Sequence, residues 1–157
     1  MLLATAPLSI KAQGEIEYVA VELDSASHAM LADYAGAHLP WPDARIIAHH
    51  MTIIHHTGMR CSPADSQRAL KDYVLDWALS HEGETVELLA TEVGASDKAF
   101  AMLITDTSVP SRNALKHITL ATHTAAGGKA VDSNFITLWS ELPEPLKLRG
   151  KVTVFYK

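Results

Sequence analysis

Two histidine–threonine pairs carry the residue types that acid–base chemistry needs. They are His50-Met51-Thr52-Ile53 and His117-Ile118-Thr119-Leu120, each inside an apolar run. If both runs are strands, residues two apart point to one face, so each pair presents an imidazole and a hydroxyl side by side. Facing across a cleft, one imidazole could accept a proton from an attacking group and the other could protonate a leaving oxygen. The hydroxyls could donate to phosphoryl oxygens, so the pattern indicates chemistry at a phosphate group.

The His-x-Thr triplet is weak evidence by itself, because it occurs three times in a chain with nine histidines. The third copy, His55-His56-Thr57, runs into Gly58. The other two lie in the middle of apolar runs, and this placement favours them. A structural interpretation stays open, in which His50 and His117 are partly buried and satisfied by backbone partners.

The run His49-His50 and His55-His56 raises the alternative of a metal site. An extended strand would place His49 and His55 on the face opposite His50, where packing or surface roles are expected. His56 would point with His50 but lie about 20 Å further along the strand. One strand thus splits the four rings between two faces, whereas catalytic zinc needs three convergent ligands. We therefore expect no metal and no other cofactor.

With these motifs the chain resembles the two-histidine (2H) phosphoesterase superfamily over about residues 16–156. The similarity is closest to the cyclic phosphodiesterase domains of RNA-repair and fungal-type tRNA-ligase systems. It rests on residues 117–122, on the glycine-containing loop 127–134 and on the closing strand 150–155.

The resemblance implies metal-independent hydrolysis of 2',3'-cyclic phosphates at RNA ends or in small nucleotides, leaving a 2'-phosphate. His50 and His117 would be the catalytic acid and base, and Thr52 and Thr119 would bind the phosphate. Tyr18 lies on the first strand, where relatives place residues of the cleft. Cyclic dinucleotides or 2'-5' oligonucleotides are alternative substrates, and a nucleotide-binding or RNA-end-binding module without turnover is a further alternative.

Other polar and aromatic residues are weaker candidates for substrate contact. Trp41 could stack on a base or anchor a loop. Lys129 follows Gly127-Gly128, but the spacing of a phosphate-binding loop is absent, so a turn at the cleft edge is expected. The candidate basic contacts to RNA are Arg45, Arg112, Lys116 and Lys129.

The elements that must position these residues follow from periodicity, caps and turn residues. Strands are expected over 16–23, 45–55, 85–93, 98–106, 114–122 and 151–156, and helices over 26–38, 63–80 and 131–139. Pro143 and Pro145 are expected to break structure before the last strand. This order predicts one α+β domain over 1–157. The resemblance adds two pseudo-symmetric lobes, each an antiparallel sheet with flanking helices, around a central groove.

Composition limits the partners. The chain has 157 residues, 48% apolar side chains and a net charge of −5, so it should fold alone but cannot hold a long polyanion by its overall field. A nucleotide or an RNA terminus is the expected partner. The single cysteine, Cys61, favours a cytoplasmic location, residues 1–10 are too short for a membrane anchor, and a monomer is expected.

Overall fold

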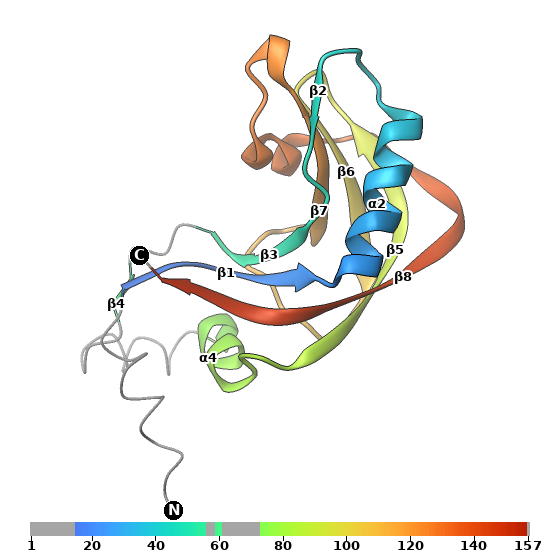
Figure 1. The fold of residues 1–157 in the computed structure, drawn as a ribbon. Helices are drawn as coiled ribbons and strands as arrows, with labels where there is room; N and C mark the ends of the chain where they lie inside the picture. Colours follow the sequence, from blue (N-terminus) through green and yellow to red (C-terminus); the bar gives the residue numbers. More distant parts are fainter. Residues whose placement is uncertain (1–14, 56–58, 61–72, 157) are drawn as a thin grey trace, which may run out of the picture.

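The strands form one antiparallel sheet that closes on itself. The computed structural model describes residues 15–55, 59–60 and 73–156. The order β7-β3-β1-β8-β5-β6 is completed by pairing of β6 with β7, which makes a six-stranded barrel (Figure 1). Strand β2 pairs with β7 and β4 pairs with β1. The strands are β1 (Glu15–Leu23), β2 (Ala44–Ile46), β3 (His50–Ile54), β4 (Met59–Arg60), β5 (Thr85–Ala95), β6 (Ala99–Asp106), β7 (His117–His123) and β8 (Trp139–Tyr156).

The segments that form strands are those whose apolar side chains are buried in the barrel. Residues 99–104 of β6 and 117–122 of β7 are buried without interruption, as expected for strands covered on both faces. β3 contributes Met51, Ile53 and Ile54 to the same core. Burying these side chains removes apolar area from water, at roughly 25 cal/mol per Å².

Two α-helices pack against the sheet, α2 (Ser25–His38) beside the barrel and α4 (Tyr73–Ser80) below β8 in the view of Figure 1. Asp24 caps α2, because its carboxylate accepts the Ser27 N–H at 2.8 Å. That hydrogen bond also lowers the pKa of Asp24. Leu31 and Ala35 bury the inner face of α2.

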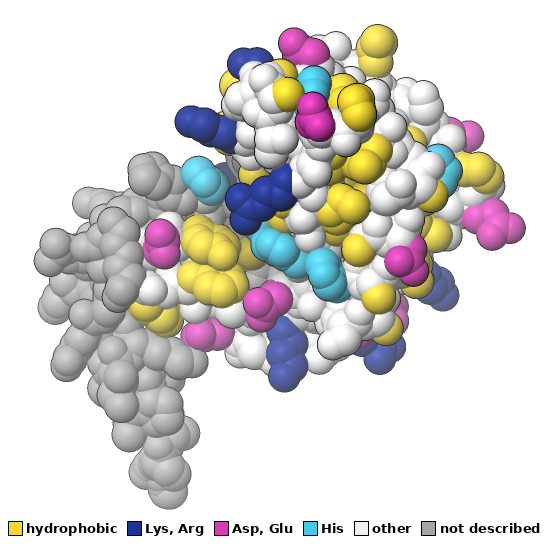
Figure 2. Space-filling model, turned by 45° about the horizontal axis from the view of Figure 1, so that its top comes forward, with side chains coloured by type: hydrophobic (Ala, Val, Ile, Leu, Met, Phe, Trp, Pro, Cys, Tyr) yellow, Lys and Arg dark blue, Asp and Glu magenta, His cyan; other side chains and the backbone are white. Residues whose placement is uncertain are grey.

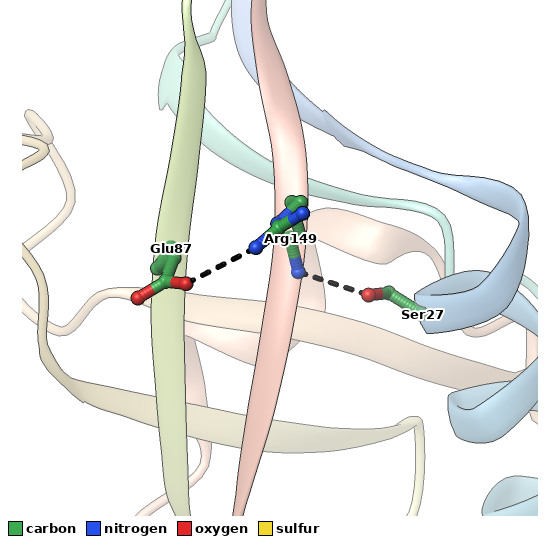
Figure 3. Close-up of polar contacts among 3 residues, drawn as sticks. All are labelled: Ser27, Glu87 and Arg149. Atoms are coloured by element: carbon green, nitrogen blue, oxygen red, sulfur yellow. Dashed lines mark hydrogen bonds and ion pairs between the residues drawn. The ribbon is translucent and has the colours of Figure 1, made fainter.

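Ser27 fixes α2 to the sheet. Its hydroxyl accepts the backbone N–H of Arg149 on β8 at 2.9 Å, and the Arg149 guanidinium contacts the Glu87 carboxylate on β5 at 3.4 Å (Figure 3). The ion pair is exposed and contributes little to stability. The backbone contact of the buried Ser27 therefore sets where the helix begins against the strand.

The predicted elements are mostly confirmed, with three corrections. The expected strand 45–55 is broken between β2 and β3, and Ala48 there has a positive φ of 56°. The expected helix 131–139 is a shorter 3-10 helix, η3 (Ala130–Phe135), after η2 (Thr124–Ala126). β8 begins at Trp139 and runs through Pro143 and Pro145, so the two prolines do not break the strand as expected. The pairing of β5 with β8 shifts register between Ala90 and Glu92, and this irregularity accommodates both prolines.

The helix predicted over 63–80 is confirmed for Tyr73–Ser80. The earlier part of that range lies outside the described residues, and so does Cys61. The fold class is α+β with an antiparallel sheet and few helices. In the part of the chain that the structure describes, no helix is long and apolar enough to cross a membrane.

Candidate active site

The two His-x-Thr motifs lie on neighbouring strands of the barrel. β3 and β7 are antiparallel, and Met51 pairs with Ile118. Both of these middle residues are fully buried in the core. The flanking histidines and threonines therefore point to the other side of the sheet, as the period of two requires.

On that side, His50, Thr52, His117 and Thr119 all line one cavity of about 390 Å³. The antiparallel register sets His50 beside Thr119 on one side of the Met51–Ile118 pair, and Thr52 beside His117 on the other. The structure thus brings together all four residues expected to carry the chemistry. Their arrangement can present two proton-transfer groups and two hydroxyl donors to one ligand.

His117 has its ring orientation fixed by the backbone. Its Nδ1 lies 2.9 Å from the Leu115 carbonyl oxygen, which can only accept, so Nδ1 carries the proton. In the neutral ring Nε2 then bears the lone pair. Burial lowers the pKa of His117 from 6.5, and the Leu115 carbonyl acts weakly in the opposite direction. This ring is suited to accept a proton at Nε2.

His50 is the more strongly perturbed of the two. Burial, followed by the positive charges that His49, His117 and His55 can carry, lowers the pKa of His50 from 6.5 to about 4. Its Nδ1 lies 2.6 Å from Nδ1 of His49. A strongly perturbed histidine in a cavity is a functional candidate with a stated cause.

Thr119 is held by Ser133, which the sequence did not indicate. The two hydroxyl oxygens are 2.8 Å apart, and Ser133, on η3, is 2% exposed. Thr119 Oγ1 also lies 3.4 Å from the Ala130 carbonyl oxygen, a long contact. The Ser133 hydroxyl can donate to Thr119 and leave the Thr119 proton for a ligand.

Tyr18 lines the cavity as expected, together with its neighbour Glu17 on β1. The Tyr18 ring stacks on Phe155 of β8 at 4.3 Å and lies 6.1 Å from the His50 ring. Burial and the carboxylates of Glu17 and Glu22 raise the pKa of Tyr18, so the phenol stays neutral.

The rest of the described wall comes from segments without a recognisable motif. Asn113 precedes β7, and Ala130, Val131 and Asn134 belong to η3. Two carboxamides thus face the cavity and can donate to or accept from a ligand. Single asparagines in loops give no spacing signal, although Asn134 closes the glycine-containing loop that carried the resemblance.

Of the two histidines expected on the opposite face in packing or surface roles, His49 is exposed and absent from the described lining, as a surface residue should be, whereas His55 is placed otherwise. His55 lines the cavity, because it follows the end of β3 at Ile54, where strand alternation no longer applies. His49 turns toward His50, because Ala48 breaks the extended backbone just before it. His56 lies outside the described residues.

Trp41 and Lys129 are not in the described lining. The Trp41 indole N–H donates to the Ser96 carbonyl at 3.2 Å, and its ring stacks on His123 at 4.7 Å. This contact anchors the loop before β2 to the β5–β6 hairpin. Lys129 is exposed at the start of η3, where its backbone N–H donates to Asp132 at 2.8 Å. The described lining also contains none of Arg45, Arg112 and Lys116.

Within the described ranges, no group of three or more histidine, cysteine or acidic residues could hold a metal ion. No known protein-family model matches the chain, and no curated protein is similar to it.

Proposed function

We propose that this protein hydrolyses 2',3'-cyclic phosphates at RNA ends or in small nucleotides by metal-independent acid–base catalysis. The supporting observation is that both His-x-Thr motifs open into one cavity from paired strands. A binding module would not need two titratable imidazoles beside two hydroxyls. The resemblance to 2H phosphoesterases, which rests on the same motifs, implies the same reaction class.

In the proposed reaction water attacks phosphorus, and His117 Nε2 accepts a proton from that water. The Leu115 carbonyl holds His117 in the tautomer that this role needs. His50 protonates the departing ribose oxygen, and the hydroxyls of Thr52 and Thr119 donate to the remaining phosphoryl oxygens. His50 becomes a competent acid when the anionic phosphate occupies the cavity, because a nearby negative charge raises the pKa of an imidazole.

The cavity volume supports a substrate of about one nucleotide. A volume of about 390 Å³ lies toward the small end of the range for ligand pockets, which is roughly 300–1,000 Å³. We extend the proposal to a pseudo-twofold relation between two lobes around this groove, supported by the antiparallel pairing of the motif centres. We also propose that the protein is a cytoplasmic monomer and that the product of the reaction is a 2'-phosphate.

The test compares turnover of 2',3'-cyclic nucleotides by wild-type protein, His50→Ala and His117→Ala. Each substitution should lower kcat by about 10²- to 10⁴-fold, the typical contribution of one positioned proton-transfer group. The losses should not add, because the two rings act as a unit. His38→Ala is the matched control, since His38 is an exposed imidazole whose ring contacts Tyr34 on α2.

Chelation and a substrate panel separate the alternatives. Activity should survive extensive EDTA treatment; loss with EDTA and recovery with zinc would favour a metal enzyme. Cyclic dinucleotides and 2'-5' oligonucleotides in the same assay test the other substrates. Folded motif variants with wild-type turnover on every cyclic phosphate would disprove the catalytic assignment.

A further inference from the structure

The backbone between β2 and β3 takes a disfavoured conformation just before the first motif. Ala48 has a φ of 56° and is the one non-glycine residue in the described ranges with positive φ. An L-residue resists this left-handed region, and such residues persist where the surroundings hold them. Here the Ala48 N–H donates to the Thr119 carbonyl at 3.0 Å, and the Ala48 carbonyl oxygen lies 3.0 Å from His28 Nδ1. Ala48 itself is fully buried.

This conformation brings two imidazoles into contact. Nδ1 of His49 lies 2.6 Å from Nδ1 of His50, and the ring centroids are 4.6 Å apart. The Leu23 N–H donates to the His49 carbonyl at 2.9 Å, which holds the backbone of the pair. His49 is exposed, whereas His50 lines the cavity. Histidine, acidic and basic side chains also lie near one another on the face drawn in Figure 2.

Only one proton fits between the two Nδ1 atoms. If His49 donates, His50 accepts at Nδ1, and its own proton stays on Nε2, the nitrogen left for the cavity. If a neutral His50 donates, its Nε2 is bare and cannot act as an acid. A cationic His50 keeps both protons, but its charge then lies on the desolvated ring. An additional positive charge is better solvated on the exposed ring than on the desolvated one. The first arrangement is therefore favoured when the pair carries one extra proton.

We infer that His49 is a positioning residue that supplies, through His50, the proton taken by the leaving oxygen; this rests on the proposed function. As the P–O bond breaks, the electron pair stays on the ribose oxygen, which takes the Nε2 proton of His50. The Nδ1 proton of His49 moves to Nδ1 of His50. The His49 cation becomes neutral and His50 remains neutral, now protonated at Nδ1. The pair is reset when Nε2 of His50 takes a proton from solvent, to which His117 releases the proton it accepted, and the shared proton returns to Nδ1 of His49.

Charged and titratable groups on α2, β1, β2 and β7 act on this pair. His49 faces His28 of α2 at 6.2 Å between ring centroids, and also Arg45 of β2 and Glu22 of β1. Burial, His28 and Arg45 lower the pKa of His49, while Glu22 raises it. His50 faces His117 of β7, His55 and the Tyr18 ring. Because the two rings are in contact, we expect the pair to take up its first proton as a unit, with the charge mainly on the exposed His49.

The first test uses the free protein and needs no substrate. Nitrogen-15 NMR of the histidine rings in the full chain assigns the tautomers, with His49→Ala and His50→Ala identifying the signals. When the pair carries one extra proton, we expect the cation on His49, with its Nδ1 protonated, and a neutral His50 protonated at Nε2 only. His50 protonated at Nδ1 would overturn the inference, whether or not the protein hydrolyses anything.

The second test measures kcat against pH on a 2',3'-cyclic nucleotide for His49→Ala and His49→Gln, with His38→Ala as control. His49→Ala should lower kcat about tenfold or more and move the alkaline limb to lower pH, because the proton must then reside on the buried ring alone. Gln donates a hydrogen bond but carries no extra proton. His49→Gln should therefore keep His50 in the tautomer protonated at Nε2, unlike His49→Ala. It should not return the alkaline limb of the kcat profile to its wild-type position.

The two tests separate the two proposals. Wild-type kcat with an unmoved alkaline limb in His49→Ala would overturn the role of His49 and leave the hydrolase proposal intact. Absence of turnover by the wild-type protein on every cyclic phosphate, with the expected tautomers, would overturn the hydrolase proposal and leave the histidine pair standing.

Discussion

The two motif imidazoles differ in what holds their Nδ1 atoms. A carbonyl oxygen holds His117, and a second imidazole holds His50. A carbonyl accepts and never donates, so the tautomer of His117 is fixed, whereas that of His50 depends on the proton count of His49. The sequence motifs are alike, but their surroundings are not. This asymmetry supports His117 as base and His50 as acid.

These surroundings predict an acidic optimum for kcat/KM, which reports on the free enzyme. The pKa of His50 is lowered to about 4, and the pKa values of His49 and His117 are lowered from 6.5. The base His117 must be neutral and the His49–His50 pair must carry one extra proton, so kcat/KM should fall on both sides of a maximum below pH 6.5. The kcat profile should lie at higher pH, because the bound phosphate anion stabilises an imidazolium. Steady-state kinetics across this range checks both, and a kcat/KM maximum on the alkaline side of neutrality would contradict the assignment.

Thr119→Val should cost stability as well as activity. The substitution leaves the buried Ser133 hydroxyl without its 2.8 Å partner, at a cost of about 1–3 kcal/mol in the free energy of unfolding. Adding Ser133→Ala removes the orphaned hydroxyl, so the double variant should lose less than the sum of the single losses. Denaturant unfolding of the four proteins measures this. Strictly additive losses would show that the two hydroxyls are not coupled.

At this scale the sequence predicted the four motif residues and Tyr18 as neighbours, because a strand period of two needs no tertiary information. It could not predict Ser133, Asn113 or Asn134, which reach the site through the path of loops and a 3-10 helix. It misplaced His55, because strand alternation was applied past a strand end, and it missed the contact of His49 with His50, because the backbone was taken to be extended through Ala48.

Among the elements, the turn after β7 is closely constrained by its two glycines. Gly127 has a φ of 73° and open space where a Cβ would be, whereas a Cβ on Gly128 would lie 2.2 Å from the Lys98 carbonyl oxygen. Gly128 also donates its N–H to the His123 carbonyl at 2.9 Å. The turn therefore packs closely against the β5–β6 hairpin and leads directly into η3.

Gly128→Ala should lower the free energy of unfolding by about 1–3 kcal/mol or more, because backbone must move to admit the methyl group. Gly127→Asn is the control and should be nearly neutral, since asparagine tolerates the left-handed region and meets no atoms there. Chemical denaturation compares the two variants. Equal stability of both would show that the close approach of Gly128 is unimportant.

The helices and strands were predicted where local signals suffice, as with the apolar runs of β1, β6 and β7. Two incorrect predictions of secondary structure have the same cause. The break at Ala48 and the passage of β8 through Pro143 and Pro145 both depend on partner strands. Thr119 on β7 holds Ala48, and the register shift of β5 accommodates the prolines. No local pattern in the sequence contains those partners.

On the scale of the whole molecule, charge argues against long nucleic acid as the ligand. The net charge is −5, and the one charged side chain other than histidine in the described cavity lining is the carboxylate of Glu17. Imidazoles, hydroxyls and carboxamides supply the remaining polar contacts. Such a site can bind one phosphodiester but gains little from the phosphates that follow it.

We therefore expect KM to be nearly the same for a 2',3'-cyclic mononucleotide and for a short RNA ending in the same cyclic phosphate. Each phosphate neutralised by a lysine or arginine adds about 0.7 to the slope of log affinity against log salt for single strands. The slope should stay near that of the mononucleotide, because Arg45, Arg112, Lys116 and Lys129 lie outside the described lining. KM values for both substrates at low and moderate salt measure this slope.

A steep slope that grows with RNA length would contradict the expectation and show that basic side chains outside the cavity bind the RNA backbone. The variant Arg112→Gln with Lys116→Gln, which reduces that slope only if those residues bind RNA, would then locate the contact.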